Sequence, residues 1–189
     1  PPLKFIAKDG TEVANPRHAT PPGTMFGAGQ KAWFKARLGA TDATWKLWAN
    51  PTPSLPMRID LASIPFTNGK NGTVGNDGWM GYPGELRELM RFVRDNGIAN
   101  LVSLAGDYHT HAAGVLVDDP DSDNPAASAV EFAVTGISSL PMFQVAKFLA
   151  TGNENFTNMT RFESGGREVE NWNATLLWGT VSALAGAFT

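Results

Sequence analysis

The segment Ile98-Ala99-Asn100-Leu101-Val102-Ser103-Leu104-Ala105-Gly106-Asp107-Tyr108-His109-Thr110-His111 decides the fold class of this 189-residue chain. A short apolar run bounded by turn residues is typical of a strand that is buried on both faces, as in a parallel sheet. Gly106 allows a sharp turn where the strand ends. Ligands of open α/β sheets bind beyond the carboxyl ends of the strands, so Asp107, His109 and His111 are candidate functional residues.

These three residues occupy alternate positions, and an extended backbone would therefore put all three side chains on one side. A carboxylate and two imidazoles that converge in this way can hold a transition metal. A lone Asp or His after a strand is more often a turn former or a hydrogen-bonded structural residue. Metal or catalytic use is favoured here because two of the chain's three histidines lie within this one loop. The third, His18, lies in a Pro-rich segment and is expected to be exposed.

Composition limits the classes of protein to which the chain can belong. A length of 189 residues suits one domain with a sizeable core. The net charge of −3 argues against a broad nucleic-acid-binding surface, and the absence of cysteine excludes disulfides and thiolate chemistry. No apolar run approaches the roughly 20 residues that a membrane span needs. The first residue is proline, so we expect a processed or partial chain, in which the lack of a visible signal peptide says nothing about export.

Helical and strand-like segments alternate along the chain, which is the pattern of a layered α/β protein. In the helix that Pro83 opens, apolar residues recur at i, i+3, i+4 and i+7, and Asn96-Gly97 ends it. The other expected elements follow from similar patterns: a short strand at Leu3–Ala7 in an irregular segment 1–25, a helix at Phe26–Leu38, strands at Ala43–Asn50, Ala112–Val117 and Val130–Val134, a helix at Leu140–Leu149, a polar loop at 151–170, and a helix at Asn173–Ala187.

Two loops invite specific alternatives. The segment 51–78 is longer than an ordinary connection, and its glycine-rich part 68–78 could suggest phosphate binding. The G-x-x-x-x-G-K-[ST] spacing is missing, so a loop at the rim of a site is favoured. The aspartate-rich segment 118–125 could suggest calcium, but the glycine and distal glutamate of an EF-hand are absent, and an exposed hairpin tip is favoured. A serine hydrolase is disfavoured because no G-x-S-x-G elbow is present.

Four blocks, in order, resemble the PhoD-like alkaline phosphatases and phosphodiesterases, which belong to the calcineurin-like metallophosphoesterases. Gly106-Asp107-Tyr108-His109 is similar to the last metal motif of that family. The other three blocks precede it at the family's spacing: Met25-Phe26-Gly27-Ala28-Gly29-Gln30-Lys31-Ala32-Trp33-Phe34, Thr44-Trp45-Lys46-Leu47-Trp48-Ala49-Asn50 and Trp79-Met80-Gly81-Tyr82-Pro83. The motif GDxH alone is weak, whereas four blocks in order are specific.

The resemblance implies an α/β fold, the C-terminal half of a four-layer sandwich with a mixed sheet and flanking helices. Residues 1–189 would then be part of one domain, with an irregular lead-in at 1–24, a core that carries the motifs at 25–139, and C-terminal helices and a loop at 140–189. The implied activity is hydrolysis of phosphate esters by metal-activated hydroxide at a di- or trinuclear site. Iron and calcium are the expected metals, with zinc or manganese as alternatives.

Site residues follow from the same resemblance. Asp107 and His109 match the metal motif and are expected ligands, whereas His111 lies outside it and could orient a ligand or protonate the leaving group. Trp79 and Tyr82 are expected at the wall of the substrate pocket. Met80 replaces the family's usual aspartate, which puts a polar role for that position in doubt.

The family's other metal ligands lie in an N-terminal half, and none of their motifs precedes Met25. Two ligands cannot fix two metals, since each ion normally takes four to six donors. We therefore expect an N-terminal half of the same enzyme as a partner, besides the phosphate-ester substrate. The alternative is a non-catalytic structural or binding module that kept the fold, and metal content would separate the two. The resemblance also implies a periplasmic or secreted protein.

Overall fold

The computed structural model describes residues 3–6, 11–59, 72–73, 77–151, 161–171 and 175. The chain divides into two compact units, each of which is described by itself. The first unit is Ala19–Val134, and the second combines Pro2–His18 with Thr135–Thr189. Every sequence-predicted site residue lies in the first unit.

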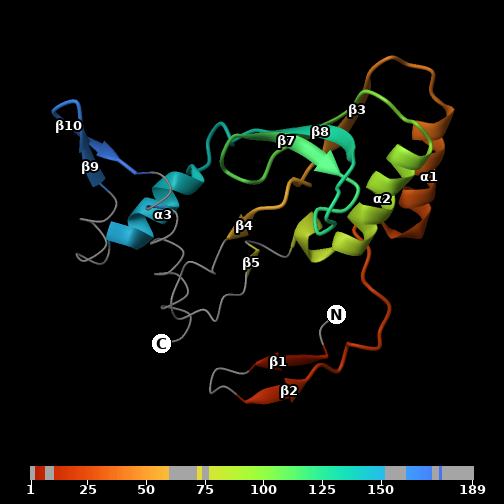
Figure 1. Ribbon diagram of the computed structural model, residues 1–189, viewed down its shortest axis with the longest axis horizontal. Helices are drawn as coiled ribbons and strands as arrows, with labels where there is room; N and C mark the ends of the chain where they lie inside the picture. Colours follow the sequence, from red (N-terminus) through yellow and green to blue (C-terminus); the bar gives the residue numbers. More distant parts are fainter. Residues whose placement is uncertain are drawn as a thin grey trace. The chain divides into compact units, whose positions relative to one another are not determined.

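A four-stranded mixed sheet lies at the centre of the first unit (Figure 1). Strand β3 (Lys46–Asn50) is parallel to β6 (Leu101–Ala105), β6 is parallel to β8 (Ala127–Ala133), and β7 (Ala112–Val117) pairs antiparallel with β8 at the other edge. This arrangement confirms the expected α/β class, although β8 begins three residues before the predicted Val130. In spatial order the strands are β3, β6, β8 and β7.

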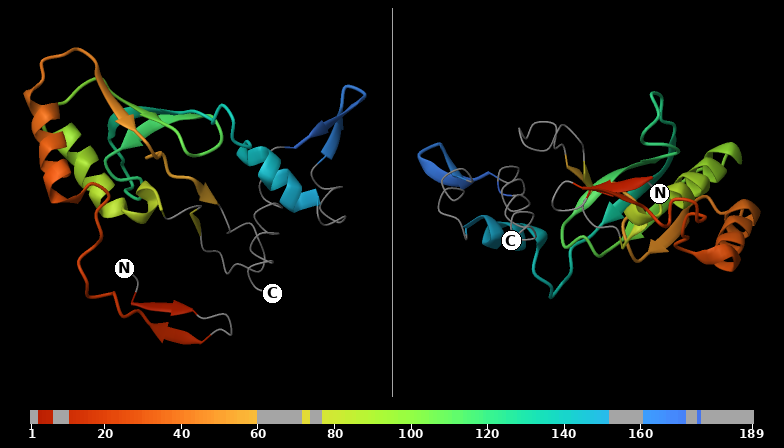
Figure 2. Two further views of the ribbon diagram at one scale, coloured as in Figure 1. Left: turned by 180° about the vertical axis from the view of Figure 1, so that it is seen from behind. Right: turned by 90° about the horizontal axis from the view of Figure 1, so that it is seen from below.

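Helices α1 (Gly27–Ala40) and α2 (Pro83–Asp95) lie side by side near the sheet, as two views show (Figure 2). Pro83 opens α2 as predicted, and Gly97 takes a φ of +62° just beyond its end, where a left-handed residue commonly stops a helix. A short 3₁₀ turn, η1 (Trp79–Gly81), leads into α2. The pair β4 (Arg58–Ile59) and β5 (Gly72–Thr73) is described, but most of the expected rim loop at 51–78 lies outside the described residues from Asp60 onward.

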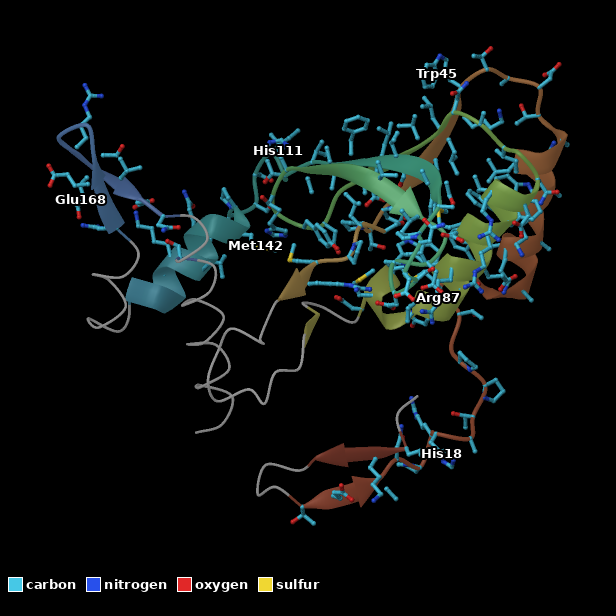
Figure 3. The ribbon with its side chains drawn as sticks, viewed as in Figure 1. His18, Trp45, Arg87, His111, Met142 and Glu168 are labelled. Carbon is cyan, nitrogen blue, oxygen red and sulfur yellow. The ribbon has the colours of Figure 1, made fainter. Side chains whose placement is uncertain are left out.

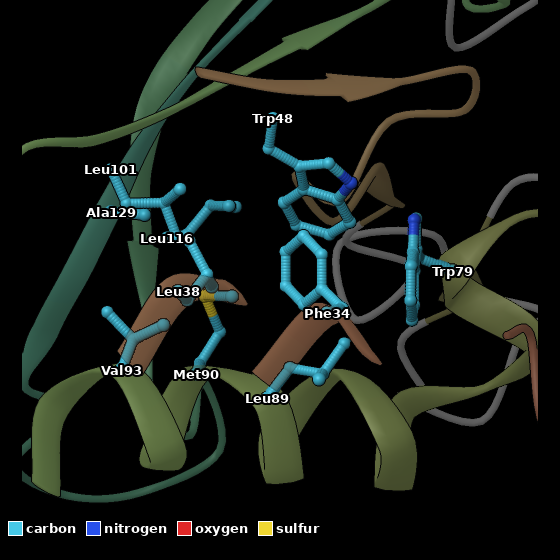
Figure 4. Close-up of a cluster of buried hydrophobic side chains, with 10 residues drawn as sticks. All are labelled: Phe34, Leu38, Trp48, Trp79, Leu89, Met90, Val93, Leu101, Leu116 and Ala129. Atoms are coloured by element: carbon cyan, nitrogen blue, oxygen red, sulfur yellow. The ribbon is translucent and has the colours of Figure 1, made fainter. Parts of the chain in front are cut away.

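The hydrophobic core lies between the two helices and one face of this sheet (Figure 4). Trp48 projects from β3 onto Phe34 of α1, with ring centroids 5.1 Å apart. Leu89 and Met90 of α2 are 0% and 1% exposed. The apolar stripe predicted for α2 faces this core, with Leu89, Met90 and Val93 buried and Leu86 half-buried, so the helical periodicity in the sequence placed this helix correctly. The buried members are Phe34, Leu38, Trp48, Trp79, Leu89, Met90, Val93, Leu101, Leu116 and Ala129.

The opposite face of the sheet is apolar and uncovered within the first unit. Leu104 and Phe132 pair across β6 and β8 and are 46% and 49% exposed. Leu47, Val115 and Val130 belong to the same face and are exposed as well. An apolar face of this kind normally packs against another layer.

The tip of the β7–β8 hairpin is bound to α2 by ion pairs. Arg91 pairs with Asp119 at 2.8 Å, and Arg94 pairs with the buried Asp118. Asp121 is exposed and pairs with Arg58 and Arg87, as expected of an aspartate at a hairpin tip. These arginines pair with three of the four aspartates in the segment that could have suggested calcium, Asp118, Asp119 and Asp121.

Among its described residues, the second unit contains helix α3 (Met142–Thr151) and two antiparallel hairpins. Helix α3 agrees with the helix predicted at Leu140–Leu149. Strand β1 (Lys4–Ile6) falls on the predicted short strand, and it pairs with β2 (Glu12–Ala14), which was not predicted. The helix predicted at Asn173–Ala187 lies outside the described residues except for Thr175.

The prediction of a polar loop at 151–170 is wrong for its last part. Strands β9 (Arg161–Ser164) and β10 (Arg167–Glu170) form a hairpin there. Gly165 and Gly166 both have positive φ, +61° and +73°, which is the geometry that a two-residue hairpin turn requires. The Gly-Gly pair was therefore the overlooked signal. Among the described helices of both units, none is long and apolar enough to cross a membrane.

Candidate metal and active site

The loop from Gly106 to His111 joins β6 to β7 at the carboxyl ends of the parallel strands. Asp107 and His109 both adopt left-handed backbone conformations, with φ of 69° and 52°. The N–H of Tyr108 donates to the Gly106 carbonyl at 2.8 Å, which tightens the bend. The predicted extended segment, with three side chains aligned on one side, is therefore wrong. The chain turns at Asp107 rather than at Gly106.

The three candidate residues differ in their surroundings. Asp107 and His111 are exposed, whereas His109 is half-buried. His111 lies beside the start of β7, and Trp45 marks the opposite end of the parallel strands (Figure 3). In the described residues, no three side chains of Asp, Glu, His or Cys lie close enough to hold a metal ion. A carboxylate and an imidazole have the right chemistry for a metal, but Asp107 and His109 supply two donors where four to six are needed.

A loop that we call the crossing loop, residues 51–57, leaves β3 and passes over the buried face of the sheet. Leu55 of this loop lies over Gly114 of β7, where a Cβ added to the glycine would come within 2.8 Å of Leu55 Cδ2. Pro51 lies near Gly106, since a Cβ on that glycine would be 3.8 Å from the Pro51 carbonyl oxygen. The crossing loop therefore borders the Asp107–His109 segment.

Glu131 of β8 is fully buried and accepts hydrogen bonds from the crossing loop. The backbone N–H groups of Ser54 and Leu55 donate to its carboxylate at 2.8 and 2.7 Å. Ser103 Oγ donates at 2.7 Å from the neighbouring strand, and Asn50 Nδ2 donates at 3.4 Å. Sequence reasoning did not single out these residues. The missed signal is that Ser103 and Glu131 are polar residues at paired positions of two largely apolar strands.

Tyr108 joins the candidate ligands to the crossing loop. Its hydroxyl donates to the carbonyl of Leu55 at 2.5 Å. Burial, together with the nearby charge of Glu131, raises the pKa of Tyr108 to about 12. The phenol therefore remains a neutral hydrogen-bond donor throughout the neutral and moderately alkaline range.

Trp79 does not occupy the position expected of a pocket wall. Its side chain is 0% exposed and lies in the core, with its ring 5.5 Å from that of Trp48 and 5.0 Å from that of Phe26 (Figure 4). The indole Nε1 donates to Asn50 Oδ1 at 3.0 Å. The expectation that Trp79 lines the substrate pocket came from the family resemblance, and its burial among aromatic rings overrules it. Tyr82 is half-buried, and its contact with substrate stays a prediction.

A hollow of about 880 Å³ lies elsewhere in the first unit, between α1 and β3. Trp33, Trp45 and Leu47 line it and are each more than half exposed. Its lining residues come from 25–51 and Trp79, so it shares Pro51 with the crossing loop, but none of residues 106–111 lines it.

The chain is similar to known phosphatases over most of its length. A family model described as PhoD-like phosphatase matches residues 6–178. Alkaline phosphatase D of Bacillus subtilis (strain 168) is 27% identical over 131 residues, which are 69% of this chain and 21% of that protein. A solved structure titled "Structure of PhoD" is 25% identical, covers 60% of this chain and 20% of that chain, and superposes with a TM-score of 0.49. The chain thus spans about a fifth of the length of the curated relative that it matches.

The family match includes every element of the first unit and the loop with Asp107 and His109. The matched range contains all four blocks that suggested the family from the sequence. The chain belongs to the PhoD-like phosphatase family.

Proposed function

We propose that this chain is part of a metal-dependent phosphoric ester hydrolase, a phosphomonoesterase or phosphodiesterase. The observation that carries the proposal is the placement of Asp107 and His109 directly after a parallel strand, in a chain of the PhoD-like phosphatase family. Asp107 and His109 are the proposed ligands of a di- or trinuclear site, with iron and calcium as the expected metals and zinc or manganese as alternatives. When bound, such ions activate water for in-line attack and neutralise charge on the phosphoryl oxygens.

His111 is proposed to act beside these ligands. Its side chain is exposed at the start of β7, two residues beyond His109, so it is accessible to a bound substrate. An imidazole there can orient the phosphoryl group or give a proton to the leaving oxygen. Tyr82, half-buried before α2, stays a proposed contact of the substrate. Trp79 is excluded from that role by its burial.

The chain is proposed to act with an N-terminal part of the same enzyme. The uncovered apolar face of the sheet supports this partner, because Leu104 and Phe132 would be buried if a second sheet packed on them, as in a sandwich. The small number of metal ligands also supports an N-terminal part, since a metal bound by Asp107 and His109 needs further ligands. We also propose that the protein is periplasmic or secreted, and this proposal rests on the family resemblance alone.

The catalytic proposal is tested by mutation in the enzyme complete with its N-terminal part. Asp107→Asn and His109→Ala should each lower turnover of p-nitrophenyl phosphate and bis-p-nitrophenyl phosphate by more than about 100-fold and release metal. His111→Ala should lower turnover about 10- to 100-fold with metal retained, as changes around the ligands do. His18→Ala, which alters the third histidine, is the matched control.

Metal content by mass spectrometry accompanies each assay. Near-normal turnover with full metal occupancy in Asp107→Asn or His109→Ala would contradict the ligand assignment, and metal-free wild-type protein without activity would favour the non-catalytic module. Loss of all metal in His111→Ala would make His111 a ligand. Intact mass and peptide mapping of the native particle test the partner, and a stable, active, metal-loaded monomer of this chain alone would refute it.

A further inference from the structure

The carboxylate of Glu131 occupies an unusual position, because it is fully buried and its described hydrogen-bond donors are all neutral. Burying a carboxylate is costly unless it is hydrogen-bonded on all sides. Here the backbone N–H groups of the consecutive residues Ser54 and Leu55 supply two of the bonds. A carboxylate bonded to two consecutive amides fixes the direction of the backbone as well as its position.

Leu55 links this buried carboxylate to the candidate ligands. Its N–H donates to Glu131, and its carbonyl accepts from the hydroxyl of Tyr108. Tyr108 stands between Asp107 and His109 in the chain, and both of these have left-handed backbones. A bent loop of this kind holds one shape only if its surroundings fix it.

We propose that Glu131 is a positioning residue for the active site: it holds the crossing loop so that Leu55 can bind Tyr108, and Tyr108 in turn holds Asp107 and His109 in place. The consequence for metal binding rests on the proposed function. The expected ordering of residues 106–111 does not rest on the proposed function, because it follows from the hydrogen bonds alone.

The structure offers a matched control in Glu85 of α2. This carboxylate is 5% exposed and also accepts from two consecutive backbone N–H groups, those of Met25 and Phe26, before α1. Lys31 lies 3.5 Å from its other oxygen. Glu85→Gln removes this ion pair as well, but like Glu131→Gln it changes a buried carboxylate that holds two consecutive backbone N–H groups, and it acts on a different segment.

The test is amide hydrogen exchange, measured by mass spectrometry on the complete, metal-free enzyme. Glu131→Gln and Tyr108→Phe should each speed exchange across residues 106–111 about tenfold, whereas Glu85→Gln should leave that segment unchanged. Tyr108→Phe removes one hydroxyl and keeps the ring, so it remains informative if Glu131→Gln fails to fold. In the metal-loaded enzyme, the same two variants should weaken metal affinity about 10- to 100-fold.

Unchanged exchange at 106–111 in Tyr108→Phe, or an equal increase in Glu85→Gln, would overturn the inference. The proposed function would be refuted by a different result, namely that the wild-type protein binds no metal and hydrolyses no phosphate ester. The exchange measurement would still decide whether Glu131 orders the loop. Faster exchange with unaltered metal affinity in an active enzyme would limit Glu131 to a structural role and overturn its assignment as a positioning residue.

Discussion

Replacing Trp79 should destabilise the fold and leave substrate binding unchanged. The side chain is 0% exposed, and aromatic side chains of this size bury about 150–250 Å², worth about 4–6 kcal/mol at 25 cal/mol per Å². Trp79→Ala would leave a cavity that the surrounding side chains fill only in part, so it should lower the free energy of unfolding by about 3–5 kcal/mol. Trp79→Phe keeps ring contacts with Phe26 and Trp48 but leaves Asn50 Oδ1 without its indole donor, and should cost about 2–3 kcal/mol.

Chemical denaturation of the chain together with its proposed N-terminal part measures the stability, and steady-state kinetics on a phosphomonoester and a phosphodiester measure the proposed activity. Leu89→Ala is the matched control, because Leu89 is equally buried in the same core and was never a site candidate. Trp79→Ala should lose about 3–5 kcal/mol and Leu89→Ala about 2–5 kcal/mol, each with KM within about twofold of wild type for the folded fraction. A several-fold change in KM or substrate preference for Trp79→Phe, without loss of stability, would refute the core assignment.

Two smaller perturbations test the packing around the sheet. Hydrogen bonds from the Ala126 N–H and the charge of Arg94 hold the pKa of Asp118 below its usual 3.8, so its stabilisation is present above that pH and is lost as pH falls through the folded value. Asp118→Asn should flatten the acid limb of a stability-against-pH curve, and an unchanged limb would contradict this. Gly114→Ala should cost about 1–3 kcal/mol by thermal denaturation, because its Cβ would lie 2.8 Å from Leu55 Cδ2, and a neutral effect would show that Leu55 moves aside freely.

Residues that follow local rules could be placed from the sequence. Pro83 and Gly97 bound α2 because a proline is tolerated in the first turn and a glycine beyond the last one. The strand before Gly106 was recognised from its apolar run, and the structure puts it inside the sheet. These features depend on a few neighbours in the chain, which is why single-sequence reasoning finds them.

The faces of the sheet could not be assigned correctly in the same way. Alternation in β8 would bury Val130 and Phe132 and expose Glu131, whereas in the first unit Glu131 is buried and Phe132 is exposed. The inversion depends on hydrogen bonds from the crossing loop, which is far away in the sequence. Trp79 was misplaced for a similar reason, because its aromatic partners Trp48 and Phe26 lie 31 and 53 residues earlier in the chain.

The left-handed backbone of Asp107 lowers the stability of the fold, whereas the carboxylate at this position is a proposed metal ligand. A non-glycine residue in that region costs roughly 1–2 kcal/mol, and glycine is free of this cost. Asp107→Gly should therefore raise the free energy of unfolding of the metal-free protein by about 1 kcal/mol while removing a proposed ligand. Under selection for stability alone, glycine would be favoured at this position. A carboxylate there is the outcome expected when the chemistry of the loop is what selection preserves.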